Sequence, residues 1–241
     1  MTRDVPHEGP HKGPPKGSPR GSPRGSPRGP PKGPPKGSPK GPHKGPVPRA
    51  TPGQVRITGG AWRSRVLRFP AAQDLRPTSD RARETLFNWL GQDLTGKTCL
   101  DLFAGSGALG FEALSRNAKA VVMVERDAKV RAALSSNATL LQTGTRLTIS
   151  ASDALQFLRT TGVEQKLYFD LIFCDPPFRE EWFSKLWPVL DALLTQDGLL
   201  YAESGVPLLA PARWRVKKSG KAGQVFYQLL ERTQISALPA Q

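Results

Sequence analysis

From residue 53 onward this chain contains no histidine. The three histidines of the 241-residue sequence are His7, His11 and His43. A Ser-His-Asp triad, a histidine zinc site and a histidine general base are therefore excluded from residues 53–241. Whatever chemistry this part of the chain performs has to use other side chains.

Cysteine and long apolar segments are scarce as well. The two cysteines, Cys99 and Cys174, each lie in or near the end of an apolar run, which predicts small buried side chains in a reducing compartment and no metal site or disulfide. No apolar run approaches the roughly 18–20 residues that span a bilayer. Residues 1–30 also lack the apolar stretch of a signal peptide. We therefore expect a cytoplasmic protein.

Proline and positive charge are concentrated at the N-terminus. Residues 1–52 hold 16 of the 24 prolines, and their eleven Lys and Arg residues against Asp4 and Glu8 give +9 of the formal net charge of +15. A cation recurs every fourth residue from Lys12 to Lys44. This composition predicts a disordered, extended polycation. It either binds nucleic acid phosphates without sequence preference or is a solvated extension.

After this tail, residues 53–94 are expected to form a β-hairpin followed by a helix. Residues 55–69 predict two short strands about a Gly59-Gly60 turn. Cations interleaved with an aromatic side chain suit RNA, through phosphate contacts and base stacking, although an ordinary basic edge hairpin gives the same pattern. The candidate RNA contacts of this hairpin are Arg56, Trp62, Arg63, Arg65 and Arg68.

The expected helix runs to Leu90. Thr78 or Ser79 can cap it, with Asp80 favourable in the first turn. The apolar spacing predicts a buried stripe at Ala82, Leu86, Phe87 and Leu90. The charged residues between them are then solvated or contact the substrate: Arg76, Arg81, Arg83 and Glu84. Of these, Arg76 and Arg81 are candidate RNA contacts.

Residues 95–233 alternate between apolar strands and amphipathic helices, and residues 234–241 form a short C-terminal tail. The expected strands are Thr98–Phe103, Ala120–Glu125, Arg146–Ala151, Phe169–Asp175 and Gly198–Glu203, and the expected helices are Ala108–Arg116, Ala128–Leu141, Ala154–Thr160 and Glu181–Leu194. This order predicts an α/β fold, a doubly wound and mostly parallel Rossmann-like sheet. Trp214–Lys218 and Gln224–Glu231, joined by a Ser-Gly-Lys-Ala-Gly loop, predict an antiparallel hairpin at one sheet edge.

A glycine-rich turn follows the first of these strands. The segment Asp101-Leu-Phe-Ala-Gly-Ser-Gly-Ala-Leu-Gly110 joins an apolar strand to a helix. Gly105 allows a sharp turn, Gly107 lets backbone approach a ligand, and Gly110 lets the helix pack on the sheet. Such a turn at a helix N-terminus is a site for a nucleotide-like ligand.

Three carboxylates narrow the range of ligands that this turn could bind. Glu125 ends the second strand, 20 residues after Gly105, where a carboxylate can accept hydrogen bonds from both ribose hydroxyls of a nucleoside. Asp153 follows the third strand and can reach an adenine edge, although it is also placed to cap a helix. Asp101 would repel the pyrophosphate of NAD but not the cationic sulfonium of S-adenosylmethionine, which favours the methyl donor.

Asp175-Pro176-Pro177-Phe178 follows the fourth strand, where ligand chemistry takes place in open α/β sheets. Prolines donate no backbone hydrogen bond and leave their carbonyl oxygens free to accept. The Asp175 carboxylate and a proline carbonyl offer two acceptors for the two hydrogens of an exocyclic amino group, and Phe178 offers a face for a flipped base. Catalysis of this kind depends on orientation and electrostatics and needs no histidine.

These segments together resemble the RsmD family of bacterial 16S ribosomal RNA guanine-N2 methyltransferases. The matching stretches are Arg56-Ile-Thr-Gly-Gly60, Leu75–Glu84, Asp101–Gly110, Asp175–Phe178 and Gly223-Gln-Val225. The resemblance implies S-adenosyl-L-methionine as cofactor, 16S rRNA as partner, free or within a small ribosomal subunit, and a monomer without metal. The residues implied for the cofactor are Asp101, Phe103, Ala104, Gly105, Ser106, Gly107, Glu125, Arg126, Asp153 and Ala154, and those for catalysis are Asp175, Pro176, Pro177 and Phe178.

Three other interpretations compete with this one. An NAD-dependent oxidoreductase would use the same glycine turn but leaves Asp175–Phe178 unexplained. A non-catalytic RNA-binding assembly factor would be expected to have a broken glycine turn or a broken acceptor motif, and both are intact. Adenine N6 in DNA or RNA fits the acceptor pair as well as guanine N2 does, so guanine rests on the family resemblance.

Overall fold

The computed structural model describes residues 52–71, 79–162, 164, 166–177 and 181–233. The basic N-terminal tail up to residue 51, Arg76, Phe178 and residues 234–241 lie outside these ranges. The predictions made for them stay predictions.

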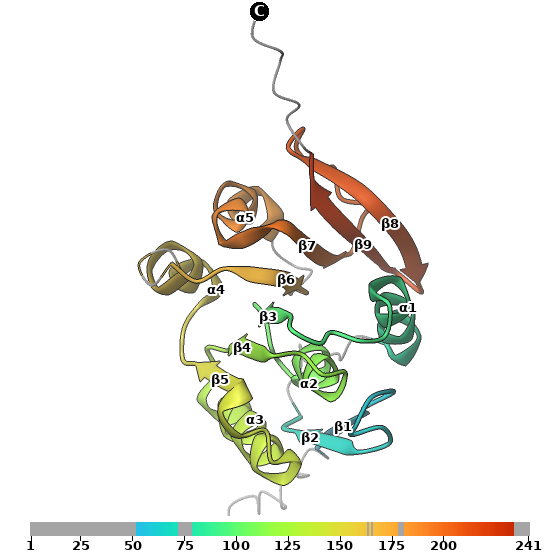
Figure 1. Ribbon diagram of the computed structural model, residues 1–241, viewed down its shortest axis with the longest axis vertical. Coiled ribbons are helices and arrows are strands. Elements are labelled where there is room, and N and C mark those ends of the chain that lie inside the picture. Colours follow the sequence, from blue (N-terminus) through green and yellow to red (C-terminus); the bar gives the residue numbers. More distant parts are fainter. Residues whose placement is uncertain (1–51, 72–78, 163, 165, 178–180, 234–241) are drawn as a thin grey trace, which may run out of the picture. The chain divides into compact units, whose positions relative to one another are not determined.

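A seven-stranded sheet forms the centre of the described part (Figure 1). Its order is β5-β4-β3-β6-β7-β9-β8, and the pairs from β5 to β7 are all parallel. β9 is antiparallel to both β7 and β8, which confirms the antiparallel hairpin at one edge. The strands are β3 (Thr98–Asp101), β4 (Ala120–Val124), β5 (Leu147–Ser150), β6 (Phe169–Cys174), β7 (Leu194–Ser204), β8 (Trp214–Ala222) and β9 (Val225–Arg232).

Helices cover both faces of this sheet. One face carries α1 (Asp80–Leu90), α2 (Ala108–Ser115) and α3 (Ala128–Leu141), and the other carries α4 (Ala154–Phe157) and α5 (Trp182–Leu190) (Figure 1). Alternate residues of the buried strands feed the two faces, so Phe173 packs with α1 and α2 while Ile172 and Cys174 pack with α4 and α5. The doubly wound α/β fold predicted from the sequence is confirmed.

The N-terminal hairpin forms a separate two-stranded sheet. β1 (Gly53–Arg56) pairs antiparallel with β2 (Val66–Phe69), and its inward side chains Val55, Leu67 and Phe69 are buried in the same core as α1 and α2. The connection is longer than the predicted Gly59-Gly60 turn: the Ile57 amide donates to Arg65 O and the Ser64 amide to Ile57 O, both as part of the loop.

The helix expected before the catalytic sheet is α1, capped by the Ser79 hydroxyl, which accepts from the Ala82 amide at 3.2 Å. The stripe formed by Ala82, Leu86 and Phe87 is buried as predicted. The expectation for Arg83 was wrong, since its side chain is 1% exposed. It turns beneath the hairpin, and its NH2 donates to Arg56 O at 2.6 Å and to the Asp80 carboxylate at 2.8 Å.

Three predicted boundaries also differ from the observed ones. The helix expected over Ala154–Thr160 is α-helical only to Phe157 and continues as a π-helical turn, Leu158–Gly162. The helix expected to reach Leu194 ends at Leu190, with Pro188 in its last turn. A 3-10 turn follows, and β7 already begins at Leu194, which pairs with Phe169.

The loop predicted over residues 219–223 is largely strand. β8 continues to Ala222, and only Gly223 and Gln224 turn the chain into β9. Gly220 is a strand residue because the Tyr227 ring occupies the space of a side chain: a Cβ there would lie 2.4 Å from that ring. Gly223 has φ +61°, which explains glycine in the tight turn.

Candidate active site at the carboxyl edge of the sheet

The chain order reverses between β3 and β6. From β3 the chain proceeds outward through β4 and β5, and it then returns to add β6 and β7 on the other side. Ligands of open α/β sheets bind at the carboxyl edge of the strands, at this switch point. The glycine turn follows β3 and Asp175 follows β6, so the structure brings both predicted motifs to this point.

Backbone hydrogen bonds fix the glycine turn between its neighbours. On one side the Leu102 amide donates to Phe173 O at 3.0 Å, two residues before Asp175. On the other side the Ala104 amide donates to Val124 O at 3.0 Å, next to Glu125. Gly105 and Gly107 have φ values of +48° and +75°, which favour glycine. The turn therefore lies between the ends of β4 and β6.

Neighbouring side chains occupy the space that a side chain at position 107 would need. A Cβ at this position would lie 2.6 Å from the Phe111 ring and 2.7 Å from Leu134. Gly107 precedes α2 without a side-chain hydrogen bond to that helix, and the Gly110 amide in the first turn donates to Asp101. The sequence predicts that a ligand uses the space at Gly107, whereas core side chains occupy it. At Gly110 a Cβ would lie 2.5 Å from Met123 of β4, which agrees with the predicted close packing of helix and sheet.

Glu125 contacts the turn directly. Its Oε2 accepts a hydrogen bond from the Gly105 amide at 3.0 Å, and its Oε1 accepts one from the Asp127 amide at 2.8 Å. The side chain is half-buried at the end of β4. A carboxylate held at the edge of the turn in this way has the position expected of a ribose acceptor.

Asp101 lies beneath the turn and is 3% exposed. Its Oδ2 accepts from the Gly110 amide at 3.0 Å, which ties the start of α2 to β3. Burial raises the pKa of this carboxyl to about 7, and the negative charge of Glu125 adds to the shift. A carboxyl of this kind holds the turn in place and changes charge near neutral pH.

Asp153 has the capping position that the sequence allowed for it. Its Oδ1 accepts from the amides of Leu155 and Gln156 at 2.9 and 3.4 Å, at the N-terminus of α4. The Glu125 amide donates to Ser150 O at 3.1 Å, so the ends of β4 and β5 are adjacent. This places Asp153 on the same edge of the sheet as Glu125, and a contact with adenine remains a prediction.

The other residues predicted for the cofactor lie around the same turn. Ala104, Ser106 and Ala154 are buried, Phe103 is half-buried, and Arg126 is exposed. The Phe103 ring packs edge-on against Trp182, with ring centroids 5.0 Å apart. Phe103, Ala104 and Ser106 belong to the turn after β3, whereas Arg126 follows β4 and Ala154 begins α4 after β5.

At the end of β6, Asp175 is half-buried, Pro176 is buried and Pro177 is exposed. Cys174, the last strand residue, is buried, and burial together with the charge of Asp175 raises the pKa of its thiol. Both cysteines are free and buried, as expected. In the described part of the chain no group of three or more His, Cys, Asp or Glu side chains is arranged to hold a metal ion, and no helix is long and apolar enough to cross a membrane.

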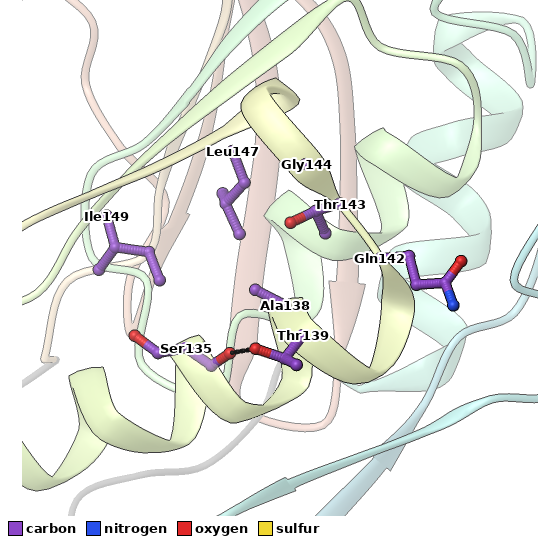
Figure 2. A pocket seen from close by; sticks show the side chains of 8 residues that line it. All are labelled: Ser135, Ala138, Thr139, Gln142, Thr143, Gly144, Leu147 and Ile149. Carbon is purple, nitrogen blue, oxygen red and sulfur yellow. Dashed lines mark hydrogen bonds between the residues drawn. The ribbon is translucent and has the colours of Figure 1, made fainter.

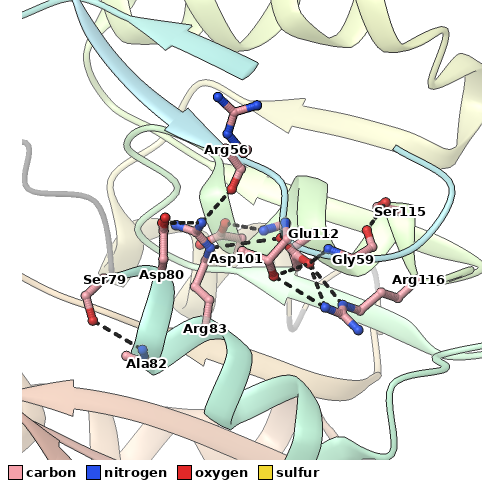
Figure 3. Close-up of polar contacts among 12 residues, drawn as sticks. Arg56, Gly59, Ser79, Asp80, Ala82, Arg83, Asp101, Glu112, Ser115 and Arg116 are labelled. Atoms are coloured by element: carbon pink, nitrogen blue, oxygen red, sulfur yellow. Dashed lines mark hydrogen bonds and ion pairs between the residues drawn. The ribbon is translucent and has the colours of Figure 1, made fainter. Parts of the chain in front are cut away.

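The N-terminal hairpin is joined to α2 by a buried cluster that the sequence analysis missed. The Glu112 carboxylate is 0% exposed, and it accepts from the Thr58 amide, the Thr58 hydroxyl and the Gly59 amide at 2.8, 2.9 and 2.8 Å (Figure 3). It also accepts from Arg116 NH2 at 2.9 Å. Arg83 Nε lies 4.0 Å from the same carboxylate. The Glu112 carboxylate therefore pairs with Arg116 and at the same time binds the backbone of the hairpin loop.

Ser115 completes the attachment. Its hydroxyl donates to Gly59 O at 2.6 Å and accepts from the Trp62 amide at 2.8 Å. The signal for this cluster was present in the sequence, since Glu112 is the one charged residue in the otherwise apolar segment Ala108–Ser115. A lone acid in an apolar helix indicates a buried partner.

The attached hairpin presents its arginines outward. Arg56, Arg63, Arg65 and Arg68 are exposed, as is Arg81 on α1, while Trp62 is half-buried beneath Arg146, whose guanidinium lies 5.4 Å from the ring centroid. Of the predicted RNA contacts that the structure describes, the arginines are exposed and Trp62 is partly covered.

Two hollows lie away from the carboxyl edge. One, of about 340 Å³, is formed by the C-terminal end of α3 and the start of β5 (Figure 2), where Leu147 is the first strand residue. The other, of about 440 Å³, lies between the hairpin loop and α1, and its lining includes Gly60, Arg63 and Arg116. Neither contains a residue of the glycine turn or of the acceptor motif.

Comparison with known proteins gives a consistent result. The family model described as Conserved hypothetical protein 95 matches residues 55–231. The chain is 42% identical over 186 residues to Ribosomal RNA small subunit methyltransferase D of Escherichia coli K12, covering 75% of this chain and 91% of that protein. It is 39% identical over 184 residues to the protein of that name from Haemophilus influenzae, covering 74% and 94%.

Solved structures agree. A putative methyltransferase from Escherichia coli superposes with a TM-score of 0.66 at 42% identity, covering 75% of this chain and 98% of that one. A putative methylase from Haemophilus influenzae gives 0.64 at 37% identity, covering 76% and 100%. A putative methyltransferase complexed with SAH (S-adenosylhomocysteine) shares the fold with a TM-score of 0.59 at 15% identity, covering 77% and 56%.

Proposed function

The chain belongs to the RsmD family, and we propose from this membership and the site geometry that it transfers a methyl group to the N2 amino group of a guanine in 16S ribosomal RNA. S-adenosyl-L-methionine is the cofactor. The relatives are named as ribosomal RNA small subunit methyltransferases, which supports ribosomal RNA as the substrate class. The observation that carries the proposal is the position of Asp175-Pro176 beside the glycine turn at the switch point.

The residues of the carboxyl edge fit this cofactor. It has no phosphate, and the edge presents the carboxylates of Glu125 and Asp153 with the half-buried Phe103 beside them. We propose that Glu125 accepts from the ribose hydroxyls, that Asp153 contacts the adenine, and that the turn from Ala104 to Gly107 holds the remainder through its backbone. The cofactor supplies an electrophilic methyl group on a sulfonium.

Asp175 and Pro176 would act on the acceptor base. The Asp175 carboxylate and the Pro176 carbonyl each accept one hydrogen of the amino group, which directs the nitrogen lone pair toward the methyl group. The Asp175 carboxylate would stabilise the positive charge that the amino nitrogen gains when it takes the methyl group from the sulfonium. The released proton can pass to an Asp175 oxygen. Phe178 is proposed to stack on the base.

The first test separates acceptor binding from cofactor binding. Asp175→Ala should abolish methyl transfer to 16S RNA and leave the dissociation constant for S-adenosyl-L-methionine within about threefold, a difference below 1 kcal/mol. Asp175→Asn keeps a carbonyl acceptor and should retain partial activity. Asp197→Asn, an exposed residue of β7, is the control. Equal loss of cofactor binding and methyl transfer in Asp175→Ala would contradict the acceptor role.

The second test concerns the base. Small-subunit RNA from cells lacking this protein should lose one N2-methylguanine, and the free and assembled forms of the RNA should differ as substrates if the subunit itself is recognised. Persistence of every N2-methylguanine would contradict the guanine assignment. Loss of an N6-methyladenine instead would identify adenine as the target. Full methylation with a catalytically inactive Asp175→Ala protein in the cell would indicate a non-catalytic assembly role.

A further inference from the structure

The C-terminal hairpin β8–β9 carries a basic surface at its catalytic end. Glu231 is the one acidic residue in residues 213–232. The basic residues of the same segment are Arg213, Arg215, Lys217, Lys218, Lys221 and Arg232. Four of these cations are paired: Arg215 and Lys217 with Glu231, and Arg213 and Arg232 with Asp191. The pairs gather where β8 begins and β9 ends.

The two remaining cations lie toward the other end of β8. Within the described residues, Lys218 and Lys221 form no ion pair, and both side chains are exposed. The uncompensated positive charge of the hairpin is therefore concentrated near the Gly223-Gln224 turn. β8 is the edge strand, so among residues 52–233 that the structure describes no other strand pairs with its outer side.

Strand register places this end of the hairpin in line with the acceptor motif. Cys174 of β6 pairs with Ala202 of β7, and two residues further along β7, Ser204 pairs with Phe226 of β9, which pairs with Lys221 of β8. β6 ends at Cys174, and Asp175 and Pro176 follow directly after it. Neighbouring strands are about 4.8 Å apart, so Phe226 lies about 10 Å and Lys221 about 14 Å along the row from the end of β6.

Phe226 and Lys221 form a pair at this edge. The Lys221 Nζ lies 4.5 Å from the centroid of the Phe226 ring, and the ring itself is half-buried. Phe226 alternates along β9 with Tyr227, which packs into the core against Trp89. The pair thus joins a partly exposed aromatic ring to an exposed cation, the two groups that bind a base and a phosphate of single-stranded nucleic acid.

We propose that Lys221 and Phe226, assisted by Lys218, bind the single-stranded RNA that flanks the target nucleotide. This inference rests on the proposed function, since it assumes that an RNA base reaches Asp175. Lys221 would contact a backbone phosphate, and Phe226 would stack on a base adjacent in the strand to the one that is methylated. RNA would then contact the protein on both sides of the acceptor motif, at β8–β9 as well as at the N-terminal arginines.

The test uses the full chain and two probes, a short single-stranded RNA of mixed sequence and the same RNA annealed into a duplex. Lys221→Gln should weaken binding of the single strand several-fold and reduce the slope of log K against log salt by about 0.7. Phe226→Leu keeps an apolar side chain but removes stacking, and should weaken single-strand binding about tenfold with little change for the duplex.

Arg215→Gln is the matched control, since it removes one positive charge from the paired end of the same strand. It should change single-strand binding less than twofold. The proposal is overturned if Arg215→Gln weakens binding as much as Lys221→Gln does, or if Phe226→Leu affects the single strand and the duplex equally. Methylation of 16S RNA by the wild-type protein is measured in parallel. Its absence would contradict the proposed function, whereas the binding ratios report on the hairpin alone.

Discussion

The Glu112 carboxylate of α2 accepts a hydrogen bond at 2.8 Å from the backbone amide of Gly59, 53 residues earlier in the chain. Through this contact the N-terminal hairpin is fixed to the helix that follows the glycine turn. The carboxylate is fully buried and is also paired with Arg116. The hairpin therefore shares one hydrophobic core with α1, α2 and the seven-stranded sheet.

Removal of the Glu112 charge should cost stability. In Glu112→Gln the buried Arg116 loses its charged partner, and we expect a loss of about 3–5 kcal/mol in the free energy of unfolding. Chemical denaturation monitored by fluorescence measures this. Glu84→Gln, an exposed acid on α1, should stay within about 0.5 kcal/mol of wild type. Equal stabilities of the two variants would show that the cluster contributes nothing.

Asp101 should make stability depend on pH. Its folded pKa of about 7 lies above the 3.8 of an ordinary aspartate, so between these values the folded state binds a proton that the unfolded state has released. The stability that this shift contributes is therefore fully present below about pH 4 and is lost as the pH rises toward 7. The total loss is about 1.4 kcal/mol for each unit by which the folded and unfolded pKa values differ, and stability does not change further with this group above pH 7. Asp101→Asn removes this slope.

Unfolding of wild type and Asp101→Asn across this pH range measures the difference. The gap between them should change steadily in favour of the variant from pH 4 to pH 7. Parallel stability curves would mean that Asp101 titrates in the folded state as it does in the unfolded chain.

Cofactor affinity should depend on Glu125. Glu125→Gln keeps one acceptor oxygen for the neighbouring amides but loses the charge, and hydrogen bonds to a charged group are worth about 1.5–3 kcal/mol. We expect the dissociation constant for S-adenosyl-L-methionine to rise about tenfold to a hundredfold by calorimetry, with unchanged values for Asp197→Asn. An unaltered dissociation constant in Glu125→Gln would remove this residue from the cofactor site.

The hairpin arginines should contribute to RNA binding through charge. The double variant Arg63→Gln, Arg65→Gln is expected to lower the slope of log K against log salt by about 1.4, that is about 0.7 for each phosphate contact with a single strand. The matched pair Arg159→Gln, Lys185→Gln, on exposed positions of the opposite face of the sheet, should leave the slope close to that of wild type. If both pairs lower it equally, the hairpin has no special role.

The basic tail should act in the same way if it contacts phosphates. Deletion of residues 1–52 removes a net charge of +9 and should reduce the salt slope further, while the thermal unfolding midpoint stays unchanged. Methyl transfer at saturating RNA should be retained. An unchanged salt slope would leave the tail without a role in binding.

Much of this arrangement could be predicted from the sequence because local patterns specify it. Glycine spacing predicted the turn after β3, and the alternation of apolar strands with amphipathic helices predicted a doubly wound α/β sheet. Thr78 or Ser79 predicted the start of α1. The long-range contacts were not predictable in this way. Arg83 follows the spacing of an exposed residue, yet its guanidinium is buried because the Arg56 carbonyl and Asp80 lie within reach.

The C-terminal hairpin shows the same limit. The sequence predicts a loop over residues 219–223, which include Gly220, and glycine is uncommon within strands. Only the partner strand reveals that the Tyr227 ring needs this space. The position of Lys221 relative to the end of β6 likewise depends on the register of three strand pairs, which no local pattern specifies.

The central claim is that this chain methylates the N2 amino group of a guanine in 16S ribosomal RNA. The most direct measurement is incubation of the purified protein with labelled S-adenosyl-L-methionine and small ribosomal subunits or 16S RNA lacking the modification, followed by nucleoside identification. The account predicts label in N2-methylguanosine, at one position, and none with Asp175→Ala. Label in N6-methyladenosine, or no label in any RNA nucleoside, would contradict it.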